Sequence, residues 1–360
     1  MNCPKDWPEL VVRVQSLSET GNTMIPDRYI KPPPERPCFT GDTTFNLNIP
    51  VIDLSALMTG DPTLVNATMD EISDACREWG FFQVVNHGIR DEVVDGVREI
   101  WRSFFHLPME MKQEYANSPT TYEGYGSRLG FQKGAILDWS DYFFLHYLPS
   151  NLKDHNKWPS QPPFLREAVE EYSKEIVKLG NVLLKVFSIN LGLEEDYLQK
   201  AFGGDNDNIG TCLRVNFYPK CPQPDLTLGL SSHSDPGGMT FLLPDEHVSG
   251  LQVRKDGEWI TVKPAPHAII VNIGDQIQVL TNAIYKSVEH RVIVNSDKER
   301  VSLAYFLNPK SDVLIAPASK LVTPKTPALY QSMTFNEYRL FMRTKGPQGK
   351  SQVESLKSPK

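Results

Sequence analysis

The chain has 360 residues, a net charge of −7 at pH 7 and 40% hydrophobic residues. This length and apolar content suffice for a sizeable folded core, and the acidic balance, without a stripe of Lys or Arg, argues against a nucleic-acid partner. No run approaches the roughly 18 apolar residues of a membrane span, and the N-terminus lacks the apolar stretch of a secretory signal.

Cysteine usage indicates a reducing compartment. The cysteines are odd in number and scattered, and none forms a Cys-x-x-Cys pair, which does not suit a disulfide scaffold. We expect a cytoplasmic location, with the nucleus as an alternative, and a monomer without a membrane partner. The five cysteines are Cys3, Cys38, Cys76, Cys212 and Cys221.

The N-terminal half predicts helices and short strands. Residues 1–48 are rich in Pro, Thr and Arg and are expected to run irregularly over the surface. The segment 49–54 resembles a short buried strand, and Asp61-Pro62 is a suitable N-cap and first residue for a helix. A second strand is expected at 80–86, followed by a helix from about Asp91.

The second half changes from helical to strand periodicity. An aromatic strand is expected within 139–147, and Pro162-Pro163 opens a long amphipathic helix. From Cys212 to about Ile315 short strands alternate with turn residues such as Gly274-Asp275, which favours an antiparallel sandwich or barrel. The last helix is expected over 336–344.

These elements predict a mostly β core with flanking helices, of the α+β class, built as one catalytic unit. The expected parts are an irregular N-terminal segment (1–48), a region of helices and short strands (49–205), the β core (206–325), and a C-terminal helix and tail (326–360).

Three residues of the β region have the types and spacing of a metal centre: His233, Asp235 and His290. Alternate residues on a strand point to the same side, so the first two can address one point if their segment stays extended. His290 must come from a second strand, and a jelly roll can bring two such strands together by placing them on facing sheets. Two imidazoles and one carboxylate suit Fe(II) and leave open coordination sites, although zinc accepts the same set. We expect these residues to be both the metal ligands and the catalytic centre.

Arg300 and Ser302 follow the same alternation ten residues after His290, so both can address one ligand. A guanidinium binds a carboxylate as a two-pronged fork, and a hydroxyl adds a hydrogen bond. Fe²⁺, the Asp235 carboxylate, a dianionic 2-oxo-dicarboxylate and Arg300 together are neutral, which avoids the cost of uncompensated buried charge. The pair therefore indicates a clamp for a carboxylate cosubstrate.

Arg214, Asn216 and Tyr218 also alternate and are expected to line one face of one strand. Asn216 and Tyr218 could hold the other end of the cosubstrate or order the surroundings of the metal. An inward-facing Arg214 needs an anion partner and would address the substrate, whereas the alternative is a strand whose arginine faces solvent.

The chain resembles the plant 2-oxoglutarate- and Fe(II)-dependent dioxygenases of the flavonol synthase and anthocyanidin synthase type, over nearly its whole length. The resemblance implies a double-stranded β-helix (jelly roll) with an N-terminal helical portion, Fe(II) on the two histidines and Asp235, and 2-oxoglutarate on Arg300, Ser302 and Tyr218. It also implies O₂ as cosubstrate and ascorbate as reductant. The matching segments include Trp79-Gly80-Phe81-Phe82-Gln83-Val84-Val85-Asn86-His87-Gly88, Asn216-Phe217-Tyr218-Pro219, Gly229-Leu-Ser-Ser-His233-Ser-Asp235, Asn272-Ile-Gly274-Asp275 and Ser287-Val-Glu-His290-Arg291-Val.

Within this family the chain looks most like the jasmonate-induced oxygenases, which hydroxylate jasmonic acid to 12-hydroxyjasmonate and so attenuate defence signalling. In that group three arginines hold the substrate carboxylate, and the matching positions are Arg214, Arg339 and Arg343. Three arginines around one cavity would repel each other unless an anion bound there, which favours a carboxylate over a neutral flavonoid. The segments that carry this likeness include Thr121-Tyr-Glu-Gly-Tyr-Gly-Ser-Arg-Leu-Gly and Leu137-Asp-Trp-Ser-Asp-Tyr-Phe.

The arginine positions are compatible with the residue pattern. Arg339 and Arg343 are four apart on the predicted last helix and so lie on one face, although a solvated helix face would show the same spacing. Phe144, Phe306 and Phe335 could form an apolar wall for the substrate, or they could pack in the core. Two alternatives stay open: a flavonoid oxidase of the same family, and a non-catalytic small-molecule-binding protein on the same fold.

Overall fold

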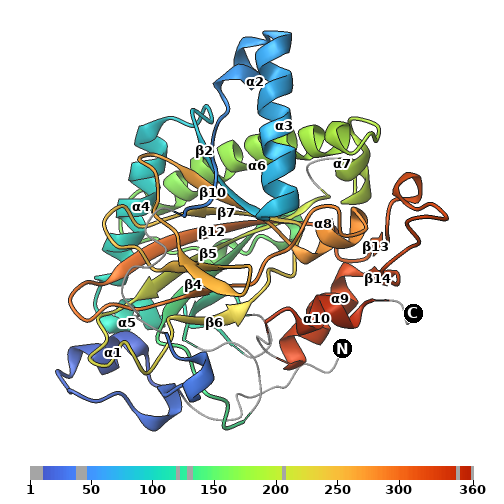
Figure 1. Ribbon diagram of the computed structural model, residues 1–360. Coiled ribbons are helices and arrows are strands. Elements are labelled where there is room, and N and C mark those ends of the chain that lie inside the picture. Colours follow the sequence, from blue (N-terminus) through green and yellow to red (C-terminus); the bar gives the residue numbers. More distant parts are fainter. Residues whose placement is uncertain are drawn as a thin grey trace.

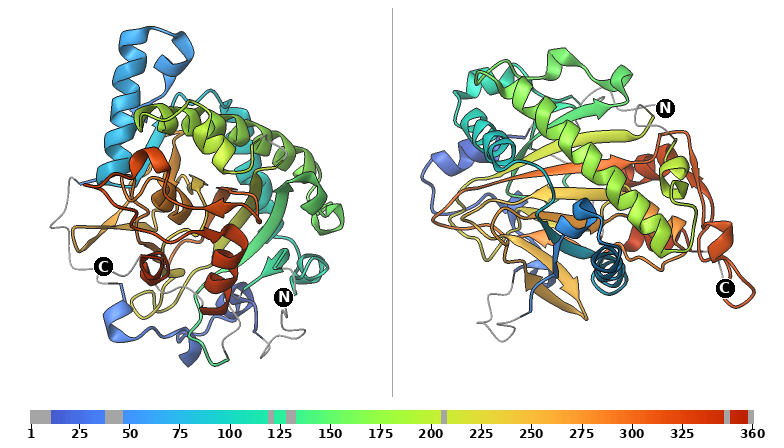
Figure 2. Two further views of the ribbon diagram at one scale, coloured as in Figure 1. Left: turned by 90° about the vertical axis from the view of Figure 1, so that its right-hand side faces the viewer. Right: turned by 90° about the horizontal axis from the view of Figure 1, so that it is seen from above.

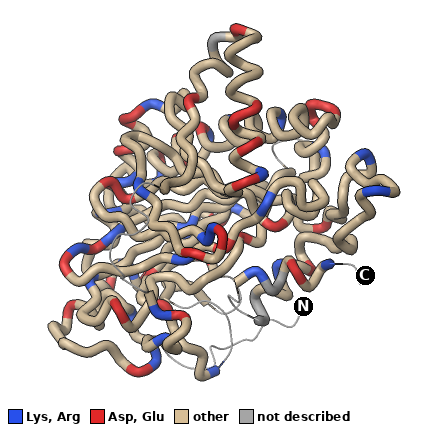
Figure 3. Tube along the Cα trace, viewed as in Figure 1, with Lys and Arg blue, Asp and Glu red and all other residues tan. Residues whose placement is uncertain are grey.

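The structure is a computed structural model that describes residues 11–37, 47–118, 122–127, 133–204, 208–345 and 349–357, except for the side chains of 59, 343–345, 351 and 352. In this part of the chain no helix is both long and apolar enough to cross a membrane. Charged residues of both signs are distributed along the trace (Figure 3).

Two β-sheets form the centre of the molecule (Figure 1). The larger sheet has eight strands in the order β1-β2-β10-β7-β12-β5-β4-β3, and the smaller has four in the order β6-β11-β8-β9. The bounds of the larger sheet are β1 Val51–Asp53, β2 Phe81–Val85, β3 Gly124–Gly126, β4 Asp141–Leu148, β5 Gly210–Tyr218, β7 Met239–Leu243, β10 Ile269–Ile273 and β12 Arg300–Asn308. Those of the smaller sheet are β6 Leu230–His233, β8 Leu251–Lys255, β9 Glu258–Thr261 and β11 His290–Val292.

Every strand pair of the two sheets is antiparallel except β1 with β2. The expected mostly β core of jelly-roll type, with flanking helices, is therefore confirmed. The longest pairing joins β5 and β12 over nine residues, from Arg300 opposite Tyr218 to Asn308 opposite Gly210. This long ladder fixes the register of the strands that carry most of the predicted ligand-binding residues.

Helices cover the larger sheet on one side (Figures 1 and 2). The longest, α6 (Leu165–Asn190), packs against α4 (Asp91–Phe105) and contacts β12. Both bury one apolar face and leave polar residues outside, as an amphipathic helix on a sheet requires. The other helices are α1 Val14–Glu19, α2 Ser55–Thr59, α3 Pro62–Glu78, α5 Met109–Gln113, α7 Tyr197–Ala201, α8 Asp275–Leu280, α9 Phe335–Lys345 and α10 Ser351–Ser355.

The helix start predicted at Asp61-Pro62 is confirmed. The Asp61 carboxylate accepts hydrogen bonds from the backbone N–H groups of Thr63 and Leu64, which otherwise have no partner in the first turn. Pro62 occupies the first helical position, where its missing N–H costs nothing.

Two regions differ from the sequence-based expectation. Residues 1–48 were expected to be irregular, but α1 forms there because the buried Asp141 carboxylate accepts the N–H groups of Val14 and Gln15 from across the molecule. Gly274-Asp275 was expected to be a turn between strands, but Asp275 begins α8. All six residues of α8 are buried, the polar Asp275, Gln276 and Gln278 included, so its polar and apolar positions show no exposed face that would indicate a helix.

The C-terminal part lies beside the smaller sheet, near the end where β6 finishes (Figure 1). Helix α9 matches the expected last helix, but α10 follows it, and β13 (Leu314–Ile315) pairs with β14 (Met333–Thr334) before it. Beyond α9, Gly349 forms a parallel bridge with His233 and donates its N–H to Ser232 O. The proposed division of the chain at residues 48, 205 and 325 stays a prediction.

Candidate functional site

His233, Asp235 and His290 come together at one end of the smaller sheet. His233 ends β6 and pairs directly with His290, the first residue of β11, so the two strands are neighbours in one sheet and not on facing sheets as expected. The Asp235 Oδ1 atom lies 3.6 Å from His233 Nε2 and 3.7 Å from His290 Nε2. One ligand atom from each residue lies within 4.8 Å of the other two, so a single metal ion can be held by all three.

A hydrogen bond from Nδ1 to a backbone carbonyl orients each of the two imidazoles. His233 Nδ1 lies 2.8 Å from Ser231 O, and His290 Nδ1 lies 3.1 Å from Val288 O. A carbonyl can only accept, so each Nδ1 donates a hydrogen bond to its carbonyl, and each Nε2, which faces Asp235, is the nitrogen left for a metal. This is the orientation that a metal-binding histidine needs.

The two oxygens of the Asp235 carboxylate have different partners. Its Oδ2 accepts hydrogen bonds from Thr240 Oγ1 at 2.5 Å and from Asn272 Nδ2 at 2.8 Å, while Oδ1 faces the histidines. Thr240 and Asn272 belong to the neighbouring strands β7 and β10. Sequence reasoning assigned no role to either residue, although Asn272 lies in one of the segments that carry the family resemblance.

Asp235 itself lies in the loop after β6, not on the strand as the alternation argument assumed. The loop is held against the end of β10 by hydrogen bonds from Gly274 N to Gly238 O, Asp275 N to Asp235 O, and Gln276 N to Gly237 O. A Cβ on Gly274 would lie only 2.3 Å from Gly237 O, so this close approach requires glycine. These contacts hold the loop that brings Asp235 to the histidines.

The charges of the three side chains suit a divalent cation. Burial alone would raise the pKa of Asp235, but the two histidines and the Thr240 hydroxyl lower it well below its usual value. Burial, together with the charge of His233, lowers the pKa of His290 to about 4, so this imidazole is neutral near pH 7. An ionised carboxylate and a neutral imidazole are the forms that coordinate iron, so the donor set fits Fe(II).

We expect Thr240→Val to weaken Fe(II) binding by about 10-fold, because it removes one of the two hydrogen bonds that hold the Asp235 carboxylate. Anaerobic Fe(II) competition with a chromophoric chelator measures the affinity. Thr261→Val is the matched control, since Thr261 lies on β9 and bonds Gln252 instead. Equal iron affinity in the two variants would contradict the supporting role.

The predicted cosubstrate residues face one another across β5 and β12. Arg300 pairs with Tyr218 and Ser302 pairs with Asn216, and all four are buried and line the cavity that contains the three metal-binding side chains. Arg300 Nη1 donates to Ser302 Oγ at 3.2 Å, and its guanidinium carbon lies 5.1 Å from the centre of the Tyr218 ring. The predicted clamp is thus assembled beside the metal-binding atoms.

The predicted substrate residues whose side chains are described line the same cavity, from β4, β5, β12 and α9. Arg214 donates from Nε to Asn216 Oδ1 at 2.7 Å, and its guanidinium lies 4.2 Å from the Tyr142 ring centre. Arg339 reaches the cavity from α9 and is close enough to Cys212 that its charge opposes the effect of burial, which raises the pKa of that thiol to about 12. The Arg343 side chain lies outside the described part of the chain.

The cavity has a volume of about 910 Å³ and is mainly apolar. Phe144, Phe306 and Phe335 all line it, from β4, β12 and α9 respectively. Sequence reasoning missed Glu123, a buried carboxyl in the cavity wall whose pKa burial raises to about 7. It lies in one of the segments that carry the likeness to the jasmonate-induced oxygenases, but that likeness assigned no role to it.

Comparison with known proteins gives consistent results over the whole chain. Residues 209–309 match the 2OG-Fe(II) oxygenase superfamily, and residues 49–161 match the N-terminal region described as non-haem dioxygenase in morphine synthesis. Jasmonate-induced oxygenase 2 of Arabidopsis thaliana is 64% identical over 355 residues, which cover 99% of this chain and 95% of that protein. Flavanone 3-dioxygenase 2 of Oryza sativa subsp. japonica is 41% identical over 325 residues, covering 90% and 92%.

Among solved structures, the crystal structure of JOX2 in complex with 2OG, Fe and JA superposes with a TM-score of 0.91. It is 64% identical in sequence, and the match covers 98% of this chain and 100% of that one. A crystal structure of a rice dioxygenase for auxin oxidation is more distant, with 26% identity, a TM-score of 0.73, and coverage of 86% of this chain and 100% of that one.

Proposed function

The chain belongs to the 2OG-Fe(II) oxygenase superfamily, and on that premise we propose that it hydroxylates jasmonic acid to 12-hydroxyjasmonate and so attenuates jasmonate signalling. The observation that carries the proposal is a mainly apolar cavity that is lined both by Arg214 and Arg339 and by the three metal-binding side chains. Identity of 64% to jasmonate-induced oxygenase 2, and the likeness to JOX2 solved with 2OG, Fe and JA, support the choice of substrate.

Bound Fe(II) supplies the coupling of O₂ reduction to oxidative decarboxylation of 2-oxoglutarate. The chain would hold the metal through His233, Asp235 and His290, whose Nε2 and Oδ1 atoms converge. Arg300 and Ser302 would bind the far carboxylate of 2-oxoglutarate, and Tyr218 and Asn216 stand opposite them on β5. These assignments explain why a buried arginine is tolerated, since it receives a carboxylate partner when the cosubstrate binds.

The other arginines that line the cavity would hold the substrate carboxylate. Arg214 and Arg339, with Arg343 of the same helix, would anchor that group, while Phe144, Phe306 and Phe335 contact the apolar part. Anchoring one end fixes how far the opposite end of the substrate reaches toward the metal-binding residues, so geometry selects the carbon that is oxidised.

The test is product identification with a panel of substrates. Purified enzyme with Fe(II), 2-oxoglutarate and ascorbate is incubated with jasmonic acid, a dihydroflavonol and small carboxylic acids, and succinate release is followed together with mass spectrometry of the organic product. We expect succinate and 12-hydroxyjasmonate in equal amounts with jasmonic acid. Turnover of the dihydroflavonol but not of jasmonic acid would overturn the proposal and favour the flavonoid oxidase.

Family membership makes the chain an enzyme, so the alternative of a non-catalytic binding protein is not supported. The flavonoid alternative has one relative in its favour, the flavanone 3-dioxygenase, but a neutral flavonoid has no carboxylate that Arg214 and Arg339 could bind. Use of ascorbate as reductant, a monomeric state and a location in the cytoplasm or nucleus stay predictions.

Helix α9 owes its position to a buried hydrogen bond, which gives a further prediction. Tyr338 Oη donates to Asp275 Oδ2 at 2.6 Å, one residue before Arg339. We expect Tyr338→Phe to raise KM for jasmonic acid about 5-fold through loss of this bond, while KM for 2-oxoglutarate stays constant. Steady-state kinetics with each substrate varied in turn measures both values, and Tyr330→Phe, which removes a hydroxyl bonded to Gln278 instead, is the control. Parallel changes in both KM values would contradict this assignment.

A further inference from the structure

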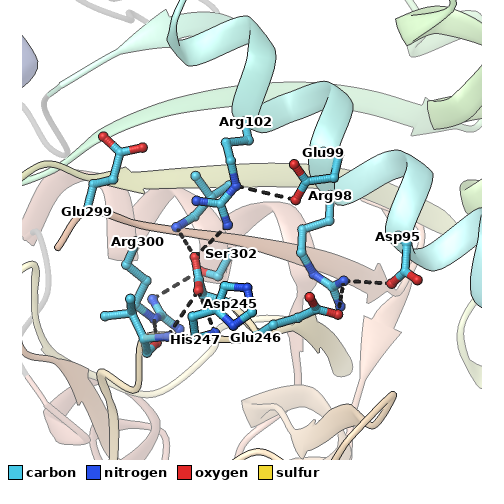
Figure 4. A network of polar contacts seen from close by, with 12 residues as sticks. Asp95, Arg98, Glu99, Arg102, Asp245, Glu246, His247, Glu299, Arg300 and Ser302 are labelled. Atoms are coloured by element: carbon cyan, nitrogen blue, oxygen red, sulfur yellow. Dashed lines mark hydrogen bonds and ion pairs between the residues drawn. The ribbon is translucent and has the colours of Figure 1, made fainter.

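A buried carboxylate outside the cavity connects the proposed cosubstrate clamp to the N-terminal helical region (Figure 4). Asp245 follows β7 and does not line the cavity, yet it is almost completely buried. Its two oxygens accept four hydrogen bonds, from three different parts of the chain. Such a fully satisfied buried carboxylate fixes the positions of its partners relative to one another.

One oxygen of Asp245 shapes the loop that contacts Arg300. Oδ1 accepts the N–H groups of His247 at 2.9 Å and Val248 at 3.1 Å, which closes a tight turn. The carbonyl of Val248 then accepts from Arg300 Nε at 3.2 Å. The loop also packs closely on the arginine stem, because a Cβ on Gly250 would lie 3.1 Å from Arg300 Cδ.

The other oxygen holds the strand that carries Arg300. Oδ2 accepts the N–H of Val301 at 3.0 Å and the Nη2 of Arg102 at 3.0 Å. Val301 is the next residue of β12, and Arg102 comes from α4. The carboxylate therefore fixes Arg300 twice, through its backbone neighbour and through the loop carbonyl that orients its Nε.

The charge of the Asp245 carboxylate suits its place between the guanidinium groups of Arg102 and Arg300. Burial would raise the pKa of Asp245, but the N–H donors and the charges of Arg102 and Arg300 lower it below its usual value, so the group is ionised. Asp245 forms its ion pair with Arg102 at 3.0 Å, and Arg102 also pairs with Glu99 at 3.4 Å. The hydrogen bonds of the Arg300 side chain go instead to a carbonyl and a hydroxyl, so its charge is available to the far carboxylate of the cosubstrate.

We infer that Asp245 is a positioning residue for 2-oxoglutarate: it sets the orientation of the Arg300 guanidinium, and α4 contributes through Arg102. The inference rests on the proposed role of Arg300 as the clamp. With Nε engaged by Val248 and Nη1 bonded to Ser302, the guanidinium plane is fixed before the ligand arrives. Less conformational freedom is then lost when the dicarboxylate binds.

The test compares two cosubstrates that share a chelating 2-oxo acid head but differ at the far end. 2-Oxoglutarate has the second carboxylate, and pyruvate lacks it. Binding of each to the Fe(II)-loaded enzyme is titrated without O₂ by the metal-to-ligand charge-transfer absorption, which needs no turnover. Asp245→Asn is nearly isosteric but places an NH₂ donor against the N–H of Val301 and the guanidinium of Arg102.

We expect Asp245→Asn to raise Kd for 2-oxoglutarate about 10-fold and to leave Kd for pyruvate unchanged. Glu246→Gln is the matched control, since Glu246 lies in the same loop but bonds Arg98, away from the clamp.

The double variant Asp245→Asn/Arg300→Leu should bind 2-oxoglutarate no more weakly than Arg300→Leu, because both substitutions act through one group. Arg102→Gln should show the same selective loss, only a few-fold, and decides the question if Asp245→Asn does not fold.

Equal losses for the two ligands, or no loss for 2-oxoglutarate, in a variant that melts as a folded protein would overturn the positioning role. A different result would contradict the proposed role of Arg300 as the clamp: an Arg300→Leu variant that keeps the full preference for 2-oxoglutarate over pyruvate. The two failures are thus distinguished by the Arg300 variant alone.

Discussion

Replacement of His233 by alanine is expected to abolish both Fe(II) binding and turnover. The substitution removes one of three convergent ligand atoms and leaves Asp235 and His290 as a two-residue site. Two ligands bind a divalent metal far more weakly than three, and the loss cannot be made up by neighbouring side chains, because no other His, Cys, Asp or Glu of the described residues belongs to the group.

Iron content of the anaerobically reconstituted variant, together with succinate release, checks this expectation. His155→Ala is a suitable control, since His155 is an exposed histidine that does not line the cavity. The control should keep full iron content and full activity. A His233→Ala protein with stoichiometric iron would refute the assignment of the metal ligands.

Replacement of Arg339 by alanine is expected to raise KM for jasmonic acid about 100-fold while iron and 2-oxoglutarate still bind with unchanged affinity. A hydrogen-bonded charge pair in a mainly apolar cavity contributes about 1.5–3 kcal/mol, which corresponds to this range of affinity. Arg339 lies on α9, whereas the proposed clamp residues lie on β5 and β12, so the two binding functions can be separated.

The measurement is kcat and KM for jasmonic acid beside the charge-transfer titration with 2-oxoglutarate. Arg339→Lys keeps the charge without the two-pronged fork and should fall between the wild type and the alanine variant. Leu340→Ala, at the exposed neighbouring position, controls for damage to the helix. Unchanged KM in Arg339→Ala would remove this arginine from the substrate site.

The residues that sequence reasoning could find are those tied together by strand alternation or by motif. Arg300 with Ser302, and Arg214 with Asn216 and Tyr218, were each predicted to share a face, and the structure brings both groups into one cavity. The two histidines converge because β6 pairs directly with β11. A jelly roll allows this pairing, but the sequence does not specify it.

The supporting residues could not be predicted, because each depends on strand order. Thr240 and Asn272 reach Asp235 only because β7 and β10 are neighbours in the larger sheet, with these two residues paired. Asp245 and Arg102 are brought together from distant parts of the chain, and neither belongs to a local pattern. In the same way α1 depends on a cap supplied by Asp141, more than a hundred residues away.

The nine-residue ladder between β5 and β12 has a consequence for how substrate preference can diverge in enzymes built this way. Its Arg300–Tyr218 end contains the proposed cosubstrate clamp, and positions 214 and 304 lie four residues along, roughly 13 Å away. Exchanges from position 214 onward can therefore change recognition of the molecule that is oxidised, while the half-reaction with 2-oxoglutarate is left intact. Positions that determine substrate preference and positions that the shared chemistry requires thus occupy different stretches of one pair of strands.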